Sequence, residues 1–136
     1  MEKHSVACIV LDGRKILIAR RNPVGQMGGR WEFPGGKRED GETDAETLVR
    51  EFREEFGVEV RAGDAVAAAS FMHDGDCVQL HAYRVFVPHD GSSVPYTLSE
   101  HSEYCWVDIG DIPRYDFVDS DLLLYPEVKA YVLAQG

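Results

Sequence analysis

The sequence predicts an α+β fold, in which a mixed β-sheet is sandwiched between helices (α/β/α) within a single domain, residues 1–136. Three observations predict it. Short apolar runs typical of strands are spread along the chain, one strongly amphipathic helical segment lies among them, and the chain closes with a second helical stretch. At 136 residues and 44% hydrophobic content, the chain can bury a core of its own.

The first strands are expected near the N-terminus. Residues 5–11 and 15–20 are apolar and rich in β-formers, and they flank Asp12-Gly13-Arg14, which predicts a hairpin. A further strand, Trp31-Glu32-Phe33, alternates in strand fashion and is ended by Pro34-Gly35-Gly36.

A helix follows the glycine pair. Thr43 with Glu46 three residues later forms a capping box, and Gly57 is placed to end the helix at C′. Apolar residues recur between them at intervals of three, four and seven, which indicates one buried face. This face comprises Ala45, Leu48, Val49, Phe52 and Phe56.

The remaining elements follow from alternation, turn residues and polarity. We expect strands at 58–61, 65–72, 77–87 and 103–109, a hairpin turn at Asp74-Gly75, a polar loop over 88–99, and a helix from about residue 120.

Composition and charge restrict the partners. The net charge of −10 argues against binding to nucleic acid polymers, whose phosphates would be repelled. Cys8, Cys77 and Cys105 are far apart and lack CxxC spacing, which favours a reduced cytoplasmic location over disulfides or zinc. With no signal peptide and no apolar run near 20 residues, we expect no membrane partner. Monomer and homodimer both stay open.

Three carboxylates on the predicted helix stand out. Glu51, Glu54 and Glu55 are spaced i, i+3 and i+4, so they fall within one arc of roughly 100°, which we expect to lie away from the apolar stripe. Such charge runs are commonly solvated helix faces. Their mutual repulsion would be relieved by a divalent cation, and oxygen ligands suit Mg²⁺ or Mn²⁺.

The segment from Gly36 to Val58 carries a recognisable motif. Gly36 is followed after five residues by Glu42, and after seven more by Arg50-Glu51-Phe52-Arg53-Glu54-Glu55-Phe56-Gly57-Val58. This pattern matches the Nudix box at every specified position, and the preceding Trp31 to Lys37 resembles the entry to that box in the MutT branch. The layout of strands is similar to a Nudix fold from end to end.

The resemblance implies a Mg²⁺-dependent pyrophosphohydrolase that releases nucleoside monophosphate and pyrophosphate. Carried over by position, the metal ligands would be Glu51, Glu54, Glu55 and the carbonyl of Gly35. Glu100 would be a further ligand or base, a role that Glu103 in the same loop could fill instead. Arg50 would hold the carboxylates through ion pairs, which completes the catalytic set. Gly36, Glu42 and Gly57 would support the geometry of the site.

The same resemblance suggests how the nucleotide is bound. By the resemblance, Phe33 is either a core aromatic or part of the nucleobase pocket. Independently of it, the positive charges of Arg21 and Lys37 suit a triphosphate tail or a base edge. Asp121, with Asp119 close by, falls where MutT-like proteins read the base. An aspartate suits a base that offers N–H groups, which leaves both (d)CTP-type and 8-oxo-dGTP substrates open.

Two other functions compete with this hypothesis. One is a Nudix hydrolase of ADP-ribose or dinucleotides, which the short chain disfavours. The other is a nucleotide sensor that has lost catalysis, which the intact run Arg50 to Glu55 disfavours.

Overall fold

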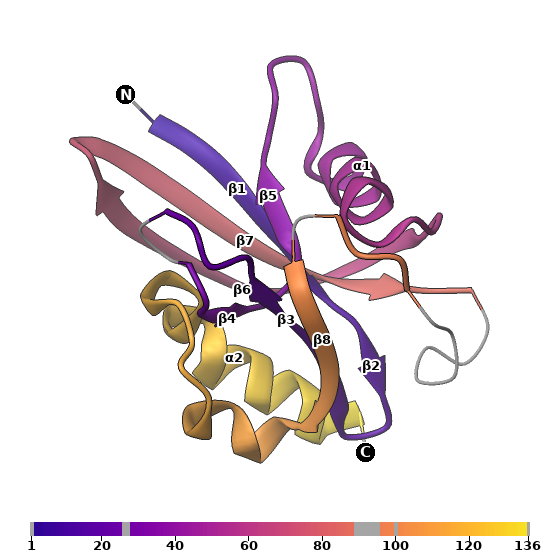
Figure 1. Ribbon diagram of the computed structural model, residues 1–136. Coiled ribbons are helices and arrows are strands. Elements are labelled where there is room, and N and C mark those ends of the chain that lie inside the picture. Colours follow the sequence, from indigo (N-terminus) through magenta and orange to yellow (C-terminus); the bar gives the residue numbers. More distant parts are fainter. Residues whose placement is uncertain (1, 26–27, 89–95, 100, 136) are drawn as a thin grey trace.

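Two four-stranded sheets lie between two helices in the computed structural model, which describes residues 2–25, 28–88, 96–99 and 101–135 (Figure 1). The strand order of the first sheet is β5-β1-β7-β6, and in the second β3 pairs with β2, β4 and β8. No helix in these ranges is long and apolar enough to cross a bilayer. The elements are β1 (Glu2–Ile9), β2 (Leu11–Asp12), β3 (Lys15–Arg21), β4 (Trp31–Glu32), β5 (Gly35–Lys37), α1 (Asp44–Phe56), β6 (Arg61–His73), β7 (Asp76–Phe86), β8 (His101–Asp108), the 3-10 helix η2 (Ile109–Arg114) and α2 (Asp119–Gln135).

The predicted hairpin between residues 5–11 and 15–20 is wrong except at its tip. Of the first predicted strand, only its end in β2 pairs with β3, through Leu11 with Ile16, and Asp12 pairs with Lys15. The longer β1 instead runs parallel to β7 and antiparallel to β5. Its apolar residues are buried in succession, which is typical of a strand covered on both faces. A hairpin at the edge of a sheet would not bury both faces.

The alternation of β1 divides the core in two. Ala7 and Ile9 face a cluster that includes Leu124 and Val128 of α2. Val6, Cys8 and Val10 face the other way, into a cluster with Leu48, Phe52 and Phe56 of α1. Each helix therefore covers one side of the strands, and β1 separates the two sides.

The ends of α1 confirm the predicted caps. Thr43 Oγ1 accepts from the Glu46 backbone N–H (3.2 Å), and Glu46 Oε1 accepts from the Thr43 backbone N–H (2.9 Å). Gly57 adopts φ 75° and donates its N–H to the carbonyl of Arg53. On the predicted apolar face, Leu48, Phe52 and Phe56 are buried, but Val49 is half-buried, and Ala45 is exposed, contrary to expectation.

Other boundaries differ from the predicted ones. The strand predicted at 58–61 is wrong except for Arg61, which begins β6. The strand predicted at 65–72 is confirmed within β6, whose pairing with β7 shifts register twice between Ala62 and Ala67. The turn Asp74-Gly75 is confirmed, with φ 50° and 83°. The strand predicted at 103–109 and the last helix are confirmed as β8 and α2, with η2 between them. Most of the loop predicted over 88–99 lies outside the described residues.

Removing the N-cap side chain should weaken α1. Thr43→Ala loses the hydroxyl acceptor for the Glu46 N–H, and we expect the free energy of unfolding to fall by about 1 kcal/mol in urea titrations. Thr97→Ala, at an exposed threonine, is the matched control. Equal stability of the two variants would contradict the role of the cap.

Candidate active site

A single guanidinium organises the acidic face of α1. Arg50 donates from Nε and Nη2 to the two carboxylate oxygens of Glu42, at 2.6 and 3.0 Å. Its Nη1 donates to Glu51 (2.9 Å) and to Glu54 (3.3 Å), and Nη2 also reaches the carbonyl of Lys37 (3.1 Å). The hydrogen bond to Glu42, followed by the one to Glu51, raises the pKa of Arg50 further above its ordinary value. Arg50 therefore joins the helix to the loop that precedes it.

Glu42 fixes the other end of this network. Besides Arg50, its Oε1 accepts from the backbone N–H of Glu39 (3.0 Å) and from Thr47 Oγ1 (2.9 Å). The hydrogen bond from Arg50 is the largest cause that lowers the pKa of Glu42 to about 2, and the bond from Glu39 is the next. The carboxylate thus stays ionised and closes the loop onto the helix.

The glycine pair makes room for the site. A Cβ on Gly35, which has φ 154°, would lie 2.0 Å from the carbonyl oxygen of Val6 on β1. A Cβ on Gly36 would lie 2.4 Å from Cδ of Glu51. The Glu51 carboxylate occupies the space that a side chain at residue 36 would fill. Close approach of β5 to both β1 and α1 therefore requires both glycines.

The three predicted carboxylates differ sharply in exposure. The side chain of Glu54 is 50% exposed and that of Glu51 13%, whereas Glu55 is only 1% exposed. The expectation that they lie away from the apolar stripe is wrong, since Glu55 follows Leu48 by seven residues and lies only about 20° from it around the helix. The acidic arc adjoins the apolar stripe, and Glu55 enters the interior.

The donor set fits a hard divalent cation in its chemistry. Carboxylate oxygens and backbone carbonyls, such as that of Gly35, are the ligands that Mg²⁺ prefers. The Glu51 carboxylate lies in the space next to Gly36, and therefore beside β5, the strand that carries the Gly35 carbonyl. Among the described residues no three acidic, histidine or cysteine side chains stand close enough together to hold a metal ion. Arg50 instead pairs with Glu51 and Glu54, so their carboxylates would have to turn from it. Glu100 lies outside the described residues.

The predicted base-reading residue Asp121 lies in the first turn of α2 and is 7% exposed. Its Oδ2 accepts from the backbone N–H of Phe33 (2.9 Å). Burial, and then the charge of Glu32, raise its pKa to about 8. The ring of Phe33 packs edge-on against Phe117 in the core, 5.0 Å between centroids. Asp121 is thus a carboxyl group that is protonated at neutral pH.

The other predicted substrate residues are more exposed. Asp119 binds Arg30 (3.0 Å), which also donates to the carbonyl of Phe117 and so ties the chain before β4 to the start of α2. Arg21, at the end of β3, donates to Glu32 Oε1 (3.1 Å). Lys37, the last residue of β5, is exposed.

Two residues in this region were not among those predicted. Glu32 receives Arg21 on one carboxylate oxygen and lies 2.9 Å from Nε2 of His101 on the other. His101 is buried, at 6% exposure. The alternation of Trp31-Glu32-Phe33 was the available signal, since it turns Glu32 away from the two aromatic rings.

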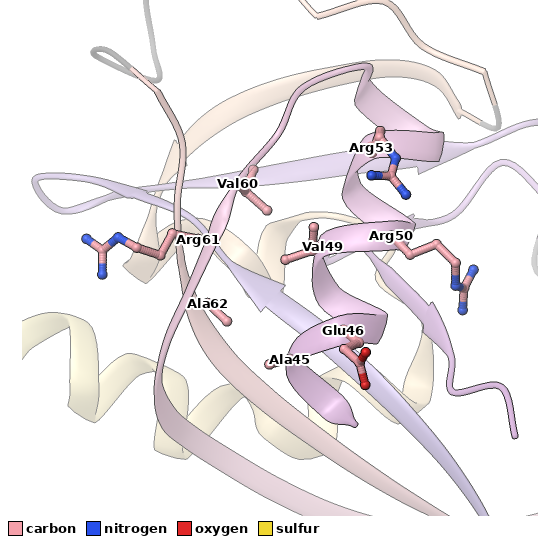
Figure 2. A pocket seen from close by; sticks show the side chains of 8 residues that line it. All are labelled: Ala45, Glu46, Val49, Arg50, Arg53, Val60, Arg61 and Ala62. Carbon is pink, nitrogen blue, oxygen red and sulfur yellow. The ribbon is translucent and has the colours of Figure 1, made fainter. Parts of the chain in front are cut away.

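A shallow groove of about 450 Å³ lies on another face of α1 (Figure 2). Figure 2 shows Val49 pointing toward Val60 and Ala62, while Arg50 extends away from them. Val49 lies about 160° around the helix from Glu51, so the groove opens on the other side of α1, with Arg50 lying between it and the acidic face. It explains why Ala45, which also lines it, is exposed.

Comparison with known proteins identifies the family. The NUDIX domain model matches residues 1–128. The chain belongs to the Nudix family. As a Nudix hydrolase it acts on phosphoric anhydrides of nucleotides, and enzymes of this family generally need a divalent metal ion.

The relatives of this Nudix hydrolase are of the MutT type. It is 34% identical over 119 residues to the CTP pyrophosphohydrolase of Escherichia coli K12, covering 88% of this chain and 85% of that protein. It is 35% identical over 123 residues to the putative 8-oxo-dGTP diphosphatase 2 of Mycobacterium tuberculosis, covering 85% and 80%. The solution structure of the E. coli ORF135 protein superposes with a TM-score of 0.83 at 31% identity, covering 98% of this chain and 93% of that one. The MutT protein of Methanosarcina mazei shares the fold, with a TM-score of 0.79 over 98% of this chain and 95% of that one, at 23% identity.

A methyl group at residue 36 should disturb the Nudix site more than the fold. In Gly36→Ala the new Cβ displaces the Glu51 carboxylate, and we expect nucleotide hydrolysis to fall at least about tenfold, with the free energy of unfolding changed by less than about 1 kcal/mol. Gly110→Ala, where the nearest atom is Asp108 Oδ1 at 3.3 Å, is the control. Unchanged kcat in the first variant would disprove the role of this space.

The raised pKa of Asp121 has a signed effect on stability. The pKa is about 8 in the fold against 3.8 ordinarily, so between these pH values the folded protein binds more protons than the unfolded chain, and stability falls as pH rises. Asp121→Asn removes this dependence. We expect the variant to gain stability relative to the wild type from about pH 4 to pH 8, with no further gain above that, in urea titrations at several pH values.

The matched control is Asp119→Asn, at an exposed aspartate two residues earlier. Parallel stability curves for the wild type and Asp121→Asn would show that the carboxyl group is ionised throughout.

Proposed function

We propose that this Nudix hydrolase is a Mg²⁺-dependent nucleoside triphosphate pyrophosphohydrolase, which releases nucleoside monophosphate and pyrophosphate from a (d)CTP-type or 8-oxo-dGTP substrate. The observation that carries the proposal is the acidic face of α1, gathered by Arg50 against the Gly35-Gly36 strand. A polyphosphate can reach backbone and carboxylates together at such a place.

The groups that would hold the metal are the carboxylates of Glu51, Glu54 and Glu55 and the carbonyl of Gly35. Glu100 is proposed as a further ligand or the base. When bound, Mg²⁺ supplies positive charge to phosphate oxygens and lowers the pKa of a bound water, and Mn²⁺ is expected to substitute.

The chain's own residues would orient the reactants. Arg50 restrains Glu51 and Glu54 and so limits the repulsion between them. Because the side chain of Glu54 is half exposed, its carboxylate is available to accept a proton from an attacking water. Lys37 and Arg21 are exposed cations that could bind the triphosphate tail.

Asp121 is proposed to read the base in its neutral form. With a pKa of about 8, the carboxyl donates one hydrogen bond and accepts another at pH 7. Cytosine offers its exocyclic amine as donor and N3 as acceptor, and oxidised guanine offers N1–H and O6. The two similar enzymes named for CTP and 8-oxo-dGTP support this choice of bases.

A substrate panel tests the proposal. Nucleoside triphosphates, oxidised and methylated forms included, are compared with ADP-ribose and dinucleotides for release of pyrophosphate or phosphate. We expect pyrophosphate from CTP-type or 8-oxo-dGTP substrates, loss of activity in EDTA and recovery with Mg²⁺. Turnover without metal, or of ADP-ribose alone, would reject the proposal.

Neutralising one carboxylate tests the site itself. Glu54→Gln removes a proposed ligand and proton acceptor and leaves the half-exposed side chain otherwise unchanged. We therefore expect kcat to fall by about 10²-fold or more. Glu127→Gln, on the exposed side of α2, is the control. Near-normal turnover in Glu54→Gln would remove Glu54 from the site.

A further inference from the structure

A row of polar side chains runs from the exposed Arg21 into the interior of the molecule. Arg21 Nη1 lies 3.1 Å from Glu32 Oε1, and Glu32 Oε2 lies 2.9 Å from His101 Nε2. On its other edge, His101 Nδ1 lies 3.9 Å from Oε1 of Glu55. The four residues come from β3, β4, β8 and α1, so only the tertiary fold brings them together.

One end of this row reaches the proposed base pocket. Glu32 directly precedes Phe33, whose backbone N–H binds Asp121. The charge of Glu32 is also among the causes that raise the pKa of Asp121. The orientation of the Glu32 carboxylate therefore affects the group proposed to contact the base.

The other end reaches the proposed metal carboxylates. Glu55 lies on α1 between Glu51 and the apolar stripe, and the segment before β8 is fastened to the same helix. Ser99 Oγ donates to the carbonyl of Glu54 (2.5 Å), and the Ser99 N–H donates to that of Glu55 (3.4 Å). His101 is thus held against the end of α1.

The imidazole does more here than fill space. Its ring stacks on Phe56, with centroids 5.7 Å apart and planes at 18°, a contact that a phenylalanine could make equally well. Burying the two nitrogens of a ring whose side chain is only 2% exposed costs free energy unless the nitrogens make polar contacts. Here Nε2 lies within hydrogen-bond distance of Glu32 Oε2, at 2.9 Å, whereas Nδ1 lies 3.9 Å from Glu55 Oε1, within ion-pair range but beyond a hydrogen bond.

We propose that His101 is a positioning residue that couples the base pocket to the metal site, by orienting Glu32 through Nε2 and Glu55 through Nδ1. The proposal rests on the proposed function, since that assigns Glu55 to the metal and Asp121 to the base. Loss of His101 is therefore expected to weaken nucleotide binding and metal binding together.

Three variants separate the two contacts. A glutamine amide reaches the position of Nε2, and an asparagine amide that of Nδ1, so each keeps one contact, while His101→Phe keeps the stacking and loses both. The readouts are the Kd for Mn²⁺ alone by calorimetry, KM and kcat for the triphosphate that the wild type hydrolyses, and the urea midpoint.

We expect His101→Phe to raise both the Mn²⁺ Kd and KM about tenfold or more. His101→Gln should retain KM and raise the Mn²⁺ Kd, and His101→Asn should do the reverse. Equal losses on both readouts in the Gln and Asn variants, or no loss in the Phe variant, would overturn the proposal. If the Phe variant does not fold, the Gln and Asn pair still decides.

Failure of the proposed function is seen separately. It would appear as wild-type protein that hydrolyses no triphosphate, whereas the Mn²⁺ titrations need no turnover. In that case a Mn²⁺ Kd unchanged in His101→Gln would still overturn the coupling.

Discussion

The guanidinium of Arg50 is the interaction on which the candidate site depends. It is the shared hydrogen-bond donor for Glu42 in the loop, for Glu51 and Glu54 on α1, and for the carbonyl of Lys37 at the end of β5. Without a cation at this point, acidic side chains on one helix face would repel one another and the loop would lose its anchor. The planar fork of arginine suits this role, because it donates in several fixed directions.

The carboxyl groups of Glu42 and Asp121 have pKa values shifted in opposite directions. In the loop before α1, the hydrogen bond from Arg50 lowers the pKa of Glu42 to about 2 and keeps that carboxylate ionised. On α2, Asp121 is surrounded by the core and by the charge of Glu32, and the proton is retained to about pH 8. The one carboxyl group is therefore an anion held by a cation, and the other is a neutral group that can both donate and accept a hydrogen bond.

β1 packs against both helices and so links the acidic face of α1 to the region of Asp121. Its alternate residues face the α1 cluster and the α2 cluster, and its edge pairs with Gly35 and Gly36 of β5. Phe33, two residues before that pairing, carries the N–H that binds Asp121. A shift of β5 along β1 would therefore move both the glycine pair and the Phe33 N–H that binds Asp121.

The sequence by itself determined the local features, because they depend on neighbours along the chain. The capping box of Thr43, the stop at Gly57, the turn at Asp74-Gly75 and the family motif with its acidic residues all follow from spacing. Partners distant in sequence were decided only by the tertiary structure. The pairing of β1 with β7 and the depth of Glu55 beside Leu48 depend on which faces become covered. The meeting of Glu32 with His101, 69 residues apart, depends on β4 and β8 both pairing with β3, and no periodicity along the chain encodes such a contact.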